Sequence, residues 1–86
     1  MKTIEIYSTS ACHFCHMEKD YLTEKGIAFT DYNVGEDMEK RNHVFQLTGQ
    51  LGVPVTVITD SEHPDQPDVI VGFSQALLDE KLGITA

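Results

Sequence analysis

Both cysteines of the chain, Cys12 and Cys15, lie where a strand pattern gives way to a helix pattern. Residues 3–8 alternate apolar and other side chains, and this alternation predicts a β-strand. Residues 10–26 place apolar side chains three and four positions apart and end at a glycine, which predicts an α-helix. The sequence therefore predicts a pair of thiols at a strand-to-helix junction.

The remaining segments predict strands and helices in alternation. Strand patterns cover residues 27–34, 53–59 and 69–73, and helix patterns cover residues 35–50 and 74–83. Residues 60–68 hold two prolines and three aspartates, so we expect a loop longer than a tight hairpin needs. The order β-α-β-α-β-β-α predicts an α/β fold, in which a central mixed sheet carries helices on both faces.

Local signals support the predicted helices. Ser10 and Ser74 are the expected N-caps of the first and the last helix. In the first helix the apolar side chains that recur at helical spacing are Phe14, Met17, Tyr21 and Leu22. In the second helix, which Gly49 is expected to end, the apolar stripe consists of Met38, Val44, Phe45 and Leu47.

The length and the charge of the chain restrict its class. Its 86 residues suffice for one small domain, residues 1–86, and are too few for two. The net charge of −8 would repel nucleic acid, and no apolar run approaches the roughly 20 residues that span a bilayer. The first residues lack the apolar run of a signal peptide, so we expect a cytoplasmic protein. In a reducing compartment two cysteines rarely form a lasting structural bridge.

The predicted junction favours redox chemistry of the two thiols. Unpaired N–H groups and the helix dipole put partial positive charge at a helix N-terminus, so we expect Cys12 to lose its proton more readily than a free cysteine. Cys15 follows one turn deeper on the same face, and we expect it to be less exposed and to keep an ordinary pKa. Such a pair suits disulfide exchange: Cys12 attacks a substrate disulfide, and Cys15 then attacks Cys12 and releases the reduced substrate.

Other interpretations of the cysteines stay open on these residues alone. The segment from Cys12 to His16 also satisfies the haem-attachment pattern C-x-x-C-H. A zinc site could combine the cysteines with His13 or His16 and with the distant His43 or His63. An iron–sulfur cluster would need further thiols from a second subunit or from another molecule, and two buried core cysteines are the simplest alternative. His13 is either a charge that favours the thiolate or a solvated side chain.

Three segments of the chain resemble the glutaredoxin-like proteins of the thioredoxin superfamily. Residues 6–15, IYSTSACHFC, resemble the family's first strand and its redox-active C-x-x-C. Residues 47–58, LTGQLGVPVTVI, resemble the segment that carries the family's cis-proline, and residues 69–84, VIVGFSQALLDEKLGI, resemble its last strand, glycine turn and last helix. The resemblance covers almost the whole chain and implies a four-stranded mixed sheet flanked by three helices.

The resemblance also implies roles for individual residues. Cys12 matches the catalytic nucleophile and Cys15 the resolving thiol. The residues that would line the substrate site are Tyr7, His13, Val53, Pro54, Gly72, Phe73 and Ser74. Val53 precedes the matching proline, and its backbone would pair with a bound substrate chain. Gly72 matches a turn glycine that lets the backbone approach the ligand, whereas Tyr7 is equally compatible with an ordinary strand tyrosine.

The chain departs from the glutathione-using members at three places. Thr9 stands where those members often carry a lysine, Gly52 where they often carry a threonine, and Ser74 with Gln75 where they often carry an aspartate. Because the lysine and the aspartate would pair with the two ends of glutathione, these departures weaken a glutathione site. Backbone groups of Val53 and Ser74 could still bind glutathione.

We therefore predict a dithiol–disulfide oxidoreductase that reduces protein disulfides or glutathione mixed disulfides through Cys12 and Cys15. The pair Gly72-Phe73 is closer to the redoxins that reduce ribonucleotide reductase, so the expected electron donor is either glutathione or thioredoxin reductase. We expect a monomer that needs no metal or organic cofactor, with glutathione as a candidate co-substrate and without a nucleic-acid or membrane partner. The alternative is a module in which the two cysteines bind a metal ion or an iron–sulfur cluster.

Overall fold

The computed structural model describes residues 2–49 and 52–83, which form a four-stranded sheet and three helices. The elements in chain order are β1 (Lys2–Ser8), α1 (His13–Glu24), β2 (Thr30–Asn33), α2 (Met38–Thr48), β3 (Val55–Asp60), β4 (His63–Val71) and α3 (Gln75–Leu82). The predicted α/β order is confirmed. Parts of the predicted segments fall outside the described residues, namely both ends of the predicted domain 1–86, the end of the second helix at Gln50, and Leu51 and Ile84.

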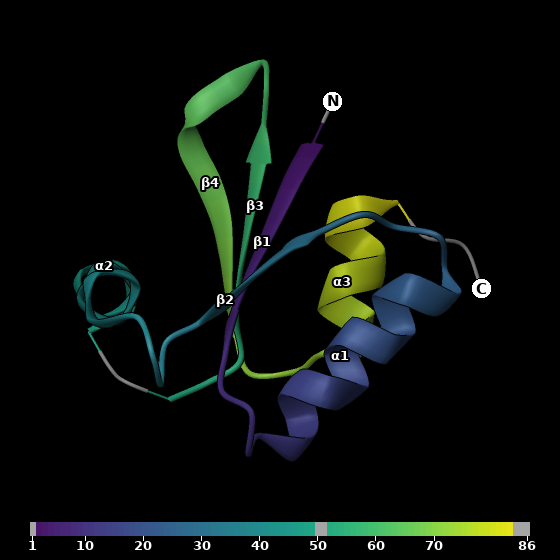
Figure 1. Ribbon diagram of the computed structural model, residues 1–86. Coiled ribbons are helices and arrows are strands. Elements are labelled where there is room, and N and C mark those ends of the chain that lie inside the picture. The colour runs from purple at the N-terminus through teal and green to yellow at the C-terminus, as the bar shows by residue number, and fades with distance from the viewer. Residues whose placement is uncertain (1, 50–51, 84–86) are drawn as a thin grey trace.

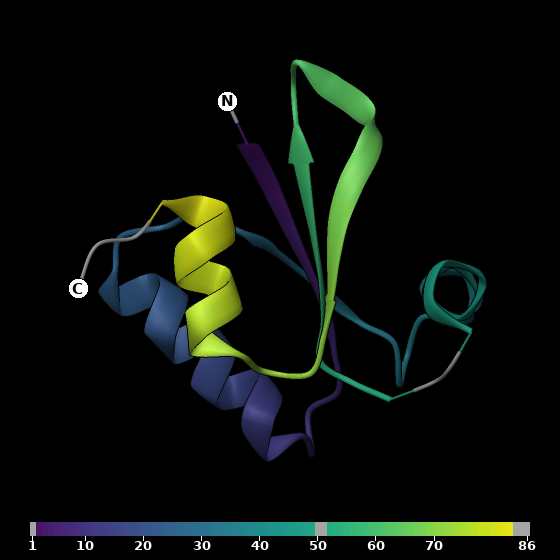
Figure 2. The ribbon, with the colours of Figure 1, turned by 180° about the vertical axis from the view of Figure 1, so that it is seen from behind.

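The sheet is mixed, with the strand order β2-β1-β3-β4. β1 pairs in parallel with β2, and β3 pairs antiparallel with both β1 and β4. Figures 1 and 2 show α1 and α3 side by side on one face of the sheet and α2 on the other. The expected arrangement, a mixed sheet with helices on both faces, is confirmed.

Each face of the sheet has its own apolar core. The core under α1 and α3 consists of Ile4, Ile6, Leu22, Ile58, Ile70 and Leu78. The core on the α2 face consists of Tyr7, Val34, Val44, Val55 and Val57. Because successive side chains of a strand point to opposite faces, the alternation in β1 sends its isoleucines to one core and its tyrosine to the other. Burial of one such aliphatic side chain contributes about 1.5–3 kcal/mol.

The first helix begins later than predicted, and of the predicted apolar row only Leu22 is buried. Its N-cap is Cys12, not Ser10. Phe14 is 57% exposed and Met17 is 41% exposed. The side chains of α1 that are buried are Cys15, Glu18 and Leu22. Successive residues of a helix lie about 100° apart around its axis. The buried row that starts at Cys15 is therefore rotated by about 100° from the predicted row that starts at Phe14.

The prediction of a loop over residues 60–68 is wrong, because most of this segment belongs to β4. The hairpin turn is short, and it is held by the N–H of Glu62, which donates to Oδ1 of Asp60 at 3.0 Å. Pro64 and Pro67 lie within the strand. They are tolerated because β4 is an edge strand, one side of which has no partner strand and needs no N–H donors. A register shift between Ile58 and Asp60 accompanies the turn.

The second helix ends at Gly49 as predicted, but it begins at Met38 rather than at Gly35, and it lacks the predicted apolar stripe. Asp37 caps its N-terminus by accepting from the N–H of Lys40, and Gly49 ends it with a φ of +72°. Of the predicted stripe only Val44 is buried. The others, Met38, Phe45 and Leu47, are 58%, 48% and 40% exposed. The stripe was wrong because this helix meets the sheet through a single buried side chain.

None of the helices within residues 2–49 and 52–83 has the length and apolar character that a membrane span requires.

Candidate active site

Cys12 occupies the N-cap position of α1, where the chain leaves β1 and turns into the helix. Its backbone is extended, its N–H donates to the carbonyl of Thr9 at 3.3 Å, and its Sγ accepts from the N–H of Cys15 at 3.2 Å. The first turn of a helix has N–H groups without helical partners, so a sulfur at this position receives a donor that would otherwise stay unpaired.

Cys12 also meets the loop before β3. Sγ of Cys12 donates to the carbonyl of Val53 at 3.8 Å. The peptide bond between Val53 and Pro54 is cis, as the family resemblance implied. The N–H of Gly72 donates to the carbonyl of Pro54 at 2.8 Å, and Gly72 has a φ of +84°, which favours glycine. The fold therefore brings Val53, Pro54 and Gly72, far apart in sequence from the cysteines, to the same place.

Cys15 lies behind Cys12 and has no exposed surface. Burial raises the pKa of the Cys15 thiol to about 12, and its hydrogen bond with Cys12 acts in the same direction. The expectation of an ordinary pKa is therefore wrong, because a position that shelters a thiol from solvent also disfavours its charged form. Both cysteines are free thiols, one partly exposed and one buried.

Three further predicted site residues take different positions. Phe73 packs against the core under α1 and α3, with its ring 6.3 Å from that of Tyr21. Ser74 is the N-cap of α3, as predicted, and its hydroxyl accepts from the N–H of Leu77 at 3.3 Å. His13 is exposed, and its ring meets the ring of Phe14 edge-on at 5.8 Å. An effect of His13 on the thiolate stays a prediction.

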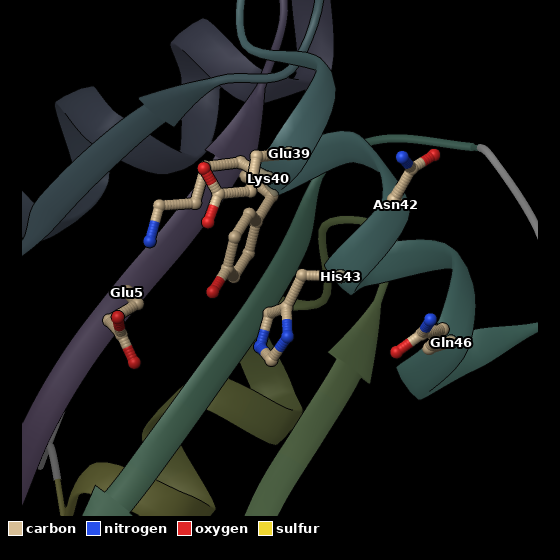
Figure 3. Close-up of a pocket in the computed structure, with 7 residues that line it drawn as sticks. Glu5, Glu39, Lys40, Asn42, His43 and Gln46 are labelled. Carbon is tan, nitrogen blue, oxygen red and sulfur yellow. The ribbon is translucent and has the colours of Figure 1, made fainter.

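Tyr7 lies on the α2 face of the sheet, whereas Cys15 belongs to a helix on the opposite face. Its ring stacks on Tyr32 at 5.2 Å and lies 6.1 Å from the ring of His43. Burial, followed by the charge of Glu5, raises the pKa of Tyr7 to about 12. Figure 3 shows the polar pocket of about 400 Å³ that Tyr7 lines together with Glu5, Glu39, Lys40, Asn42, His43 and Gln46. The role of Tyr7 beside the dithiol stays a prediction.

The histidines considered as metal ligands are dispersed. His43 lies in α2 and His63 begins β4, while Nε2 of His16 is 2.9 Å from the carbonyl of Ser10. Within residues 2–49 and 52–83, no three side chains of the metal-binding types gather into a possible site. The described part of a single chain therefore offers no support for a zinc site built on Cys12 and Cys15.

Glu18 is a buried acidic residue that sequence analysis missed. It has no exposed surface, and its Oε2 accepts from Oγ1 of Thr56 at 2.5 Å. Its pKa is raised by burial, and the Thr56 hydrogen bond opposes that shift. The spacing of Cys15, Glu18 and Leu22, three and then four residues apart, could have indicated that all three share one helix face.

Replacement of Glu18 by glutamine should remove a pH dependence of stability. Because the folded-state pKa of Glu18 is raised, the folded chain holds this proton to a higher pH than the unfolded chain does. This contribution to stability is complete below the unfolded-state pKa of about 4.3 and is lost as the pH rises through the folded-state pKa. We therefore expect the melting temperature of E18Q to rise by several degrees relative to that of the wild type as the pH is raised above about 4.3.

Thermal unfolding followed by circular dichroism measures this difference at each pH. E24Q is the matched control, because Glu24 ends the same helix and is exposed. A difference in melting temperature between E18Q and wild type that stays constant across the whole pH range would show that the charge of Glu18 costs no stability.

The fold and the thiol pair define a thioredoxin-like redox domain. The chain belongs to the glutaredoxin family, because the family model Glutaredoxin matches residues 4–63. An uncharacterized glutaredoxin-like 8.6 kDa protein in the rubredoxin operon of Clostridium pasteurianum is 42% identical over 77 residues, which are 90% of this chain and 93% of that protein. Glutaredoxin 3 of Escherichia coli K12 is 30% identical over 63 residues, which are 73% of this chain and 75% of that protein.

A solved structure supports the same assignment. Methanoredoxin of Methanosarcina acetivorans matches with a TM-score of 0.79 at 25% identity, over 95% of this chain and 85% of that protein. The predicted family and the thioredoxin-like fold are confirmed. Family membership indicates thiol–disulfide oxidoreduction in general.

Proposed function

We propose that this chain reduces protein disulfides, and glutathione mixed disulfides, through a covalent intermediate on Cys12. The observation that carries the proposal is the unequal placement of the two thiols. Cys12 is partly exposed and accepts a helix N–H at 3.2 Å, whereas Cys15 is buried directly behind it. One sulfur can thus meet a substrate while the other can reach only the first sulfur.

The reaction has two exchange steps that balance in electrons and protons. The Cys12 thiolate attacks one sulfur of the substrate disulfide, forms a mixed disulfide and releases the other substrate sulfur as a thiolate, which takes up a proton. The Cys15 thiolate then attacks Sγ of Cys12, forms the Cys12–Cys15 disulfide and releases the second substrate sulfur. Two electrons pass from the protein dithiol to the substrate, and an external donor must restore the dithiol.

Two features of the chain favour a protein donor over glutathione. The hydroxyl of Ser74, at the position where glutathione-using members often have an aspartate, is occupied as a helix cap. The net charge of −8 also repels the anionic glutathione. We propose thioredoxin reductase as the faster donor, and a monomeric, cytoplasmic protein without a metal or organic cofactor.

A two-tube assay tests this function. The oxidised protein is offered glutathione in one tube and thioredoxin reductase with NADPH in the other, and the return of free thiols is followed in both. We expect the reductase to restore both thiols at least about tenfold faster than glutathione does. A faster reaction with glutathione would reverse the donor assignment. Reduction by neither donor, or one bound metal ion per chain in freshly purified protein, would contradict the proposed function.

A further inference from the structure

α2 lines a pocket with polar side chains where a packed helix would present apolar ones. A helix usually packs on a sheet through an apolar stripe, yet Val44 is the only side chain of α2 that is buried. Glu39, His43 and Gln46 follow one another at positions i, i+4 and i+7, so they share one face of the helix. All three line the polar pocket of about 400 Å³ whose other residues come from α2 and β1 (Figure 3). A pocket therefore takes the place of apolar packing at this part of the sheet.

Tyr7 brings a buried hydroxyl group to this pocket. The residue is only 2% exposed, and it is one of those that line the pocket. Its hydroxyl makes no hydrogen bond with any residue that the structure describes. The pKa of about 12, which burial and the charge of Glu5 produce, keeps this hydroxyl a neutral phenol at neutral pH. Because a buried hydroxyl without a partner costs free energy, its partner has to come from the contents of the pocket.

Two carboxylates give the pocket its charge. Glu5 belongs to β1 and Glu39 to α2, so they reach the pocket from different elements of the fold (Figure 3). Neither forms an ion pair with another side chain of residues 2–49 and 52–83. Lys40 also lines the pocket, but its ammonium group lies over the ring of Tyr32, 4.3 Å from the ring centroid. The two carboxylates and the net charge of −8 together favour a positively charged ligand.

The acceptors of the pocket suit a planar cation. Besides the two carboxylates, the hydroxyl of Tyr7 and the side-chain amides of Asn42 and Gln46 present oxygens. A guanidinium group has five N–H donors in one plane, whereas an ammonium group has three donors. It is also more weakly hydrated, so it loses less hydration on entering the pocket. The volume of about 400 Å³ falls within the range of small-molecule sites.

We propose that this pocket binds a small guanidinium compound. The guanidinium group donates to the carboxylates of Glu5 and Glu39 and to the hydroxyl oxygen of Tyr7. Binding is non-covalent and transfers no electrons. The site lies on the α2 face of the sheet, and α1, which carries Cys15, lies on the other face (Figures 1 and 2). It therefore goes beyond the proposed function, which needs only the two thiols.

A matched pair of ligands tests the role of charge. n-Butylguanidinium and n-butylurea have nearly the same size and shape, but only the first is charged. We expect n-butylguanidinium to bind with a Kd of about 1 mM or below, and n-butylurea to bind at least about tenfold more weakly. NMR titration of the isotopically labelled protein measures both, and the shifted amide signals should belong to β1 and α2. Equal binding of the two ligands, or no binding of n-butylguanidinium, would contradict the proposal.

Single substitutions test whether the ligand occupies this pocket. E5Q and E39Q each remove one charge and should each weaken the binding of n-butylguanidinium by at least about fivefold. Y7F removes only a hydroxyl group and should weaken it by about threefold to tenfold. E80Q is the charge-matched control, because Glu80 is exposed on α3 at the opposite face, and it should stay within about twofold of wild type. If E80Q weakens binding as much as E5Q does, only the net charge attracts the ligand and the proposal is wrong.

A blocked peptide distinguishes a free guanidinium compound from an arginine of another protein. The tripeptide Gly-Arg-Gly, acetylated and amidated at its ends, carries the same group on a polypeptide. We expect it to bind no more tightly than n-butylguanidinium does, because the pocket has room for little beyond the group and a short chain. Binding of the peptide at least about tenfold more tightly would mean that a protein partner supplies the group, and the small-molecule proposal would be wrong. The proposed function is tested on the thiols and stands or falls separately.

Discussion

Replacement of Cys12 by serine should abolish disulfide reduction. The partly exposed sulfur at the N-cap is the atom that can meet a substrate, and a serine hydroxyl at the same position stays protonated and does not attack disulfides. We expect the rate to fall by at least about 1000-fold, to that of the uncatalysed reaction. NADPH consumption in the presence of thioredoxin reductase and insulin, whose disulfides serve as substrate, measures the loss.

Serine preserves the cap, so the loss is chemical rather than structural. Serine is a preferred N-cap residue and its oxygen can accept from the N–H of Cys15, as the sulfur does at 3.2 Å. The melting temperature of C12S should therefore stay within a few degrees of wild type. S10A is the matched control, since Ser10 is exposed and precedes the helix without capping it. Activity retained in C12S would mean that another group is the nucleophile, and the assignment of the site would be wrong.

Replacement of Cys15 by serine should separate the two reactions. Without a resolving thiol, a mixed disulfide between Cys12 and a protein substrate cannot be broken from within, so protein-disulfide reduction should fall by at least about 100-fold. Removal of glutathione from a glutathionylated protein needs a single protein thiol when free glutathione completes the exchange. We expect C15S to keep that reaction within about tenfold of wild type.

Mass spectrometry of C15S after brief exposure to an oxidised substrate checks the intermediate directly. The adduct should be a single substrate chain joined to Cys12, and it should disappear on addition of a small thiol. The doubly substituted C12S/C15S protein is the control, and it should form no adduct. If C15S reduces protein disulfides at the wild-type rate, the buried sulfur has no part in resolution, and the role proposed for Cys15 is wrong.

The local patterns of the sequence predicted the order of the elements well. Strict alternation in β1 and the β-branched run of β3 each favour an extended chain. Ser74 marks the start of α3 because its hydroxyl accepts a backbone N–H, and Gly49 marks the end of α2 because it takes a φ of +72°. These signals act over a few neighbouring residues, so they are visible in sequence. The family resemblance added the cis bond before Pro54, which the strand pattern alone would not predict.

The errors concern features that depend on distant parts of the chain. The two prolines of residues 60–68 suggested a loop, but an edge strand has a free side that accommodates them, and only the sheet order shows which strand is at the edge. The apolar side chains of Phe14 and Met17 predicted which face of α1 would be buried, but both side chains are exposed. The face that is buried instead includes Glu18, because the contact with Thr56 comes from a strand 38 positions away.

The sequence by itself predicted a thiol at the start of a helix, because such a thiol obtains its N–H donor from the next turn of the same segment. Tertiary structure decided everything that requires distant segments to meet: the carbonyl of Val53 beside Cys12, the complete burial of Cys15, and the hydrogen bond between Glu18 and Thr56. Solvent exclusion is the physical reason for the difference. A pKa of about 12 for Cys15 arises only when a helix and a sheet together remove water from its surroundings, and no run of neighbouring residues can do that.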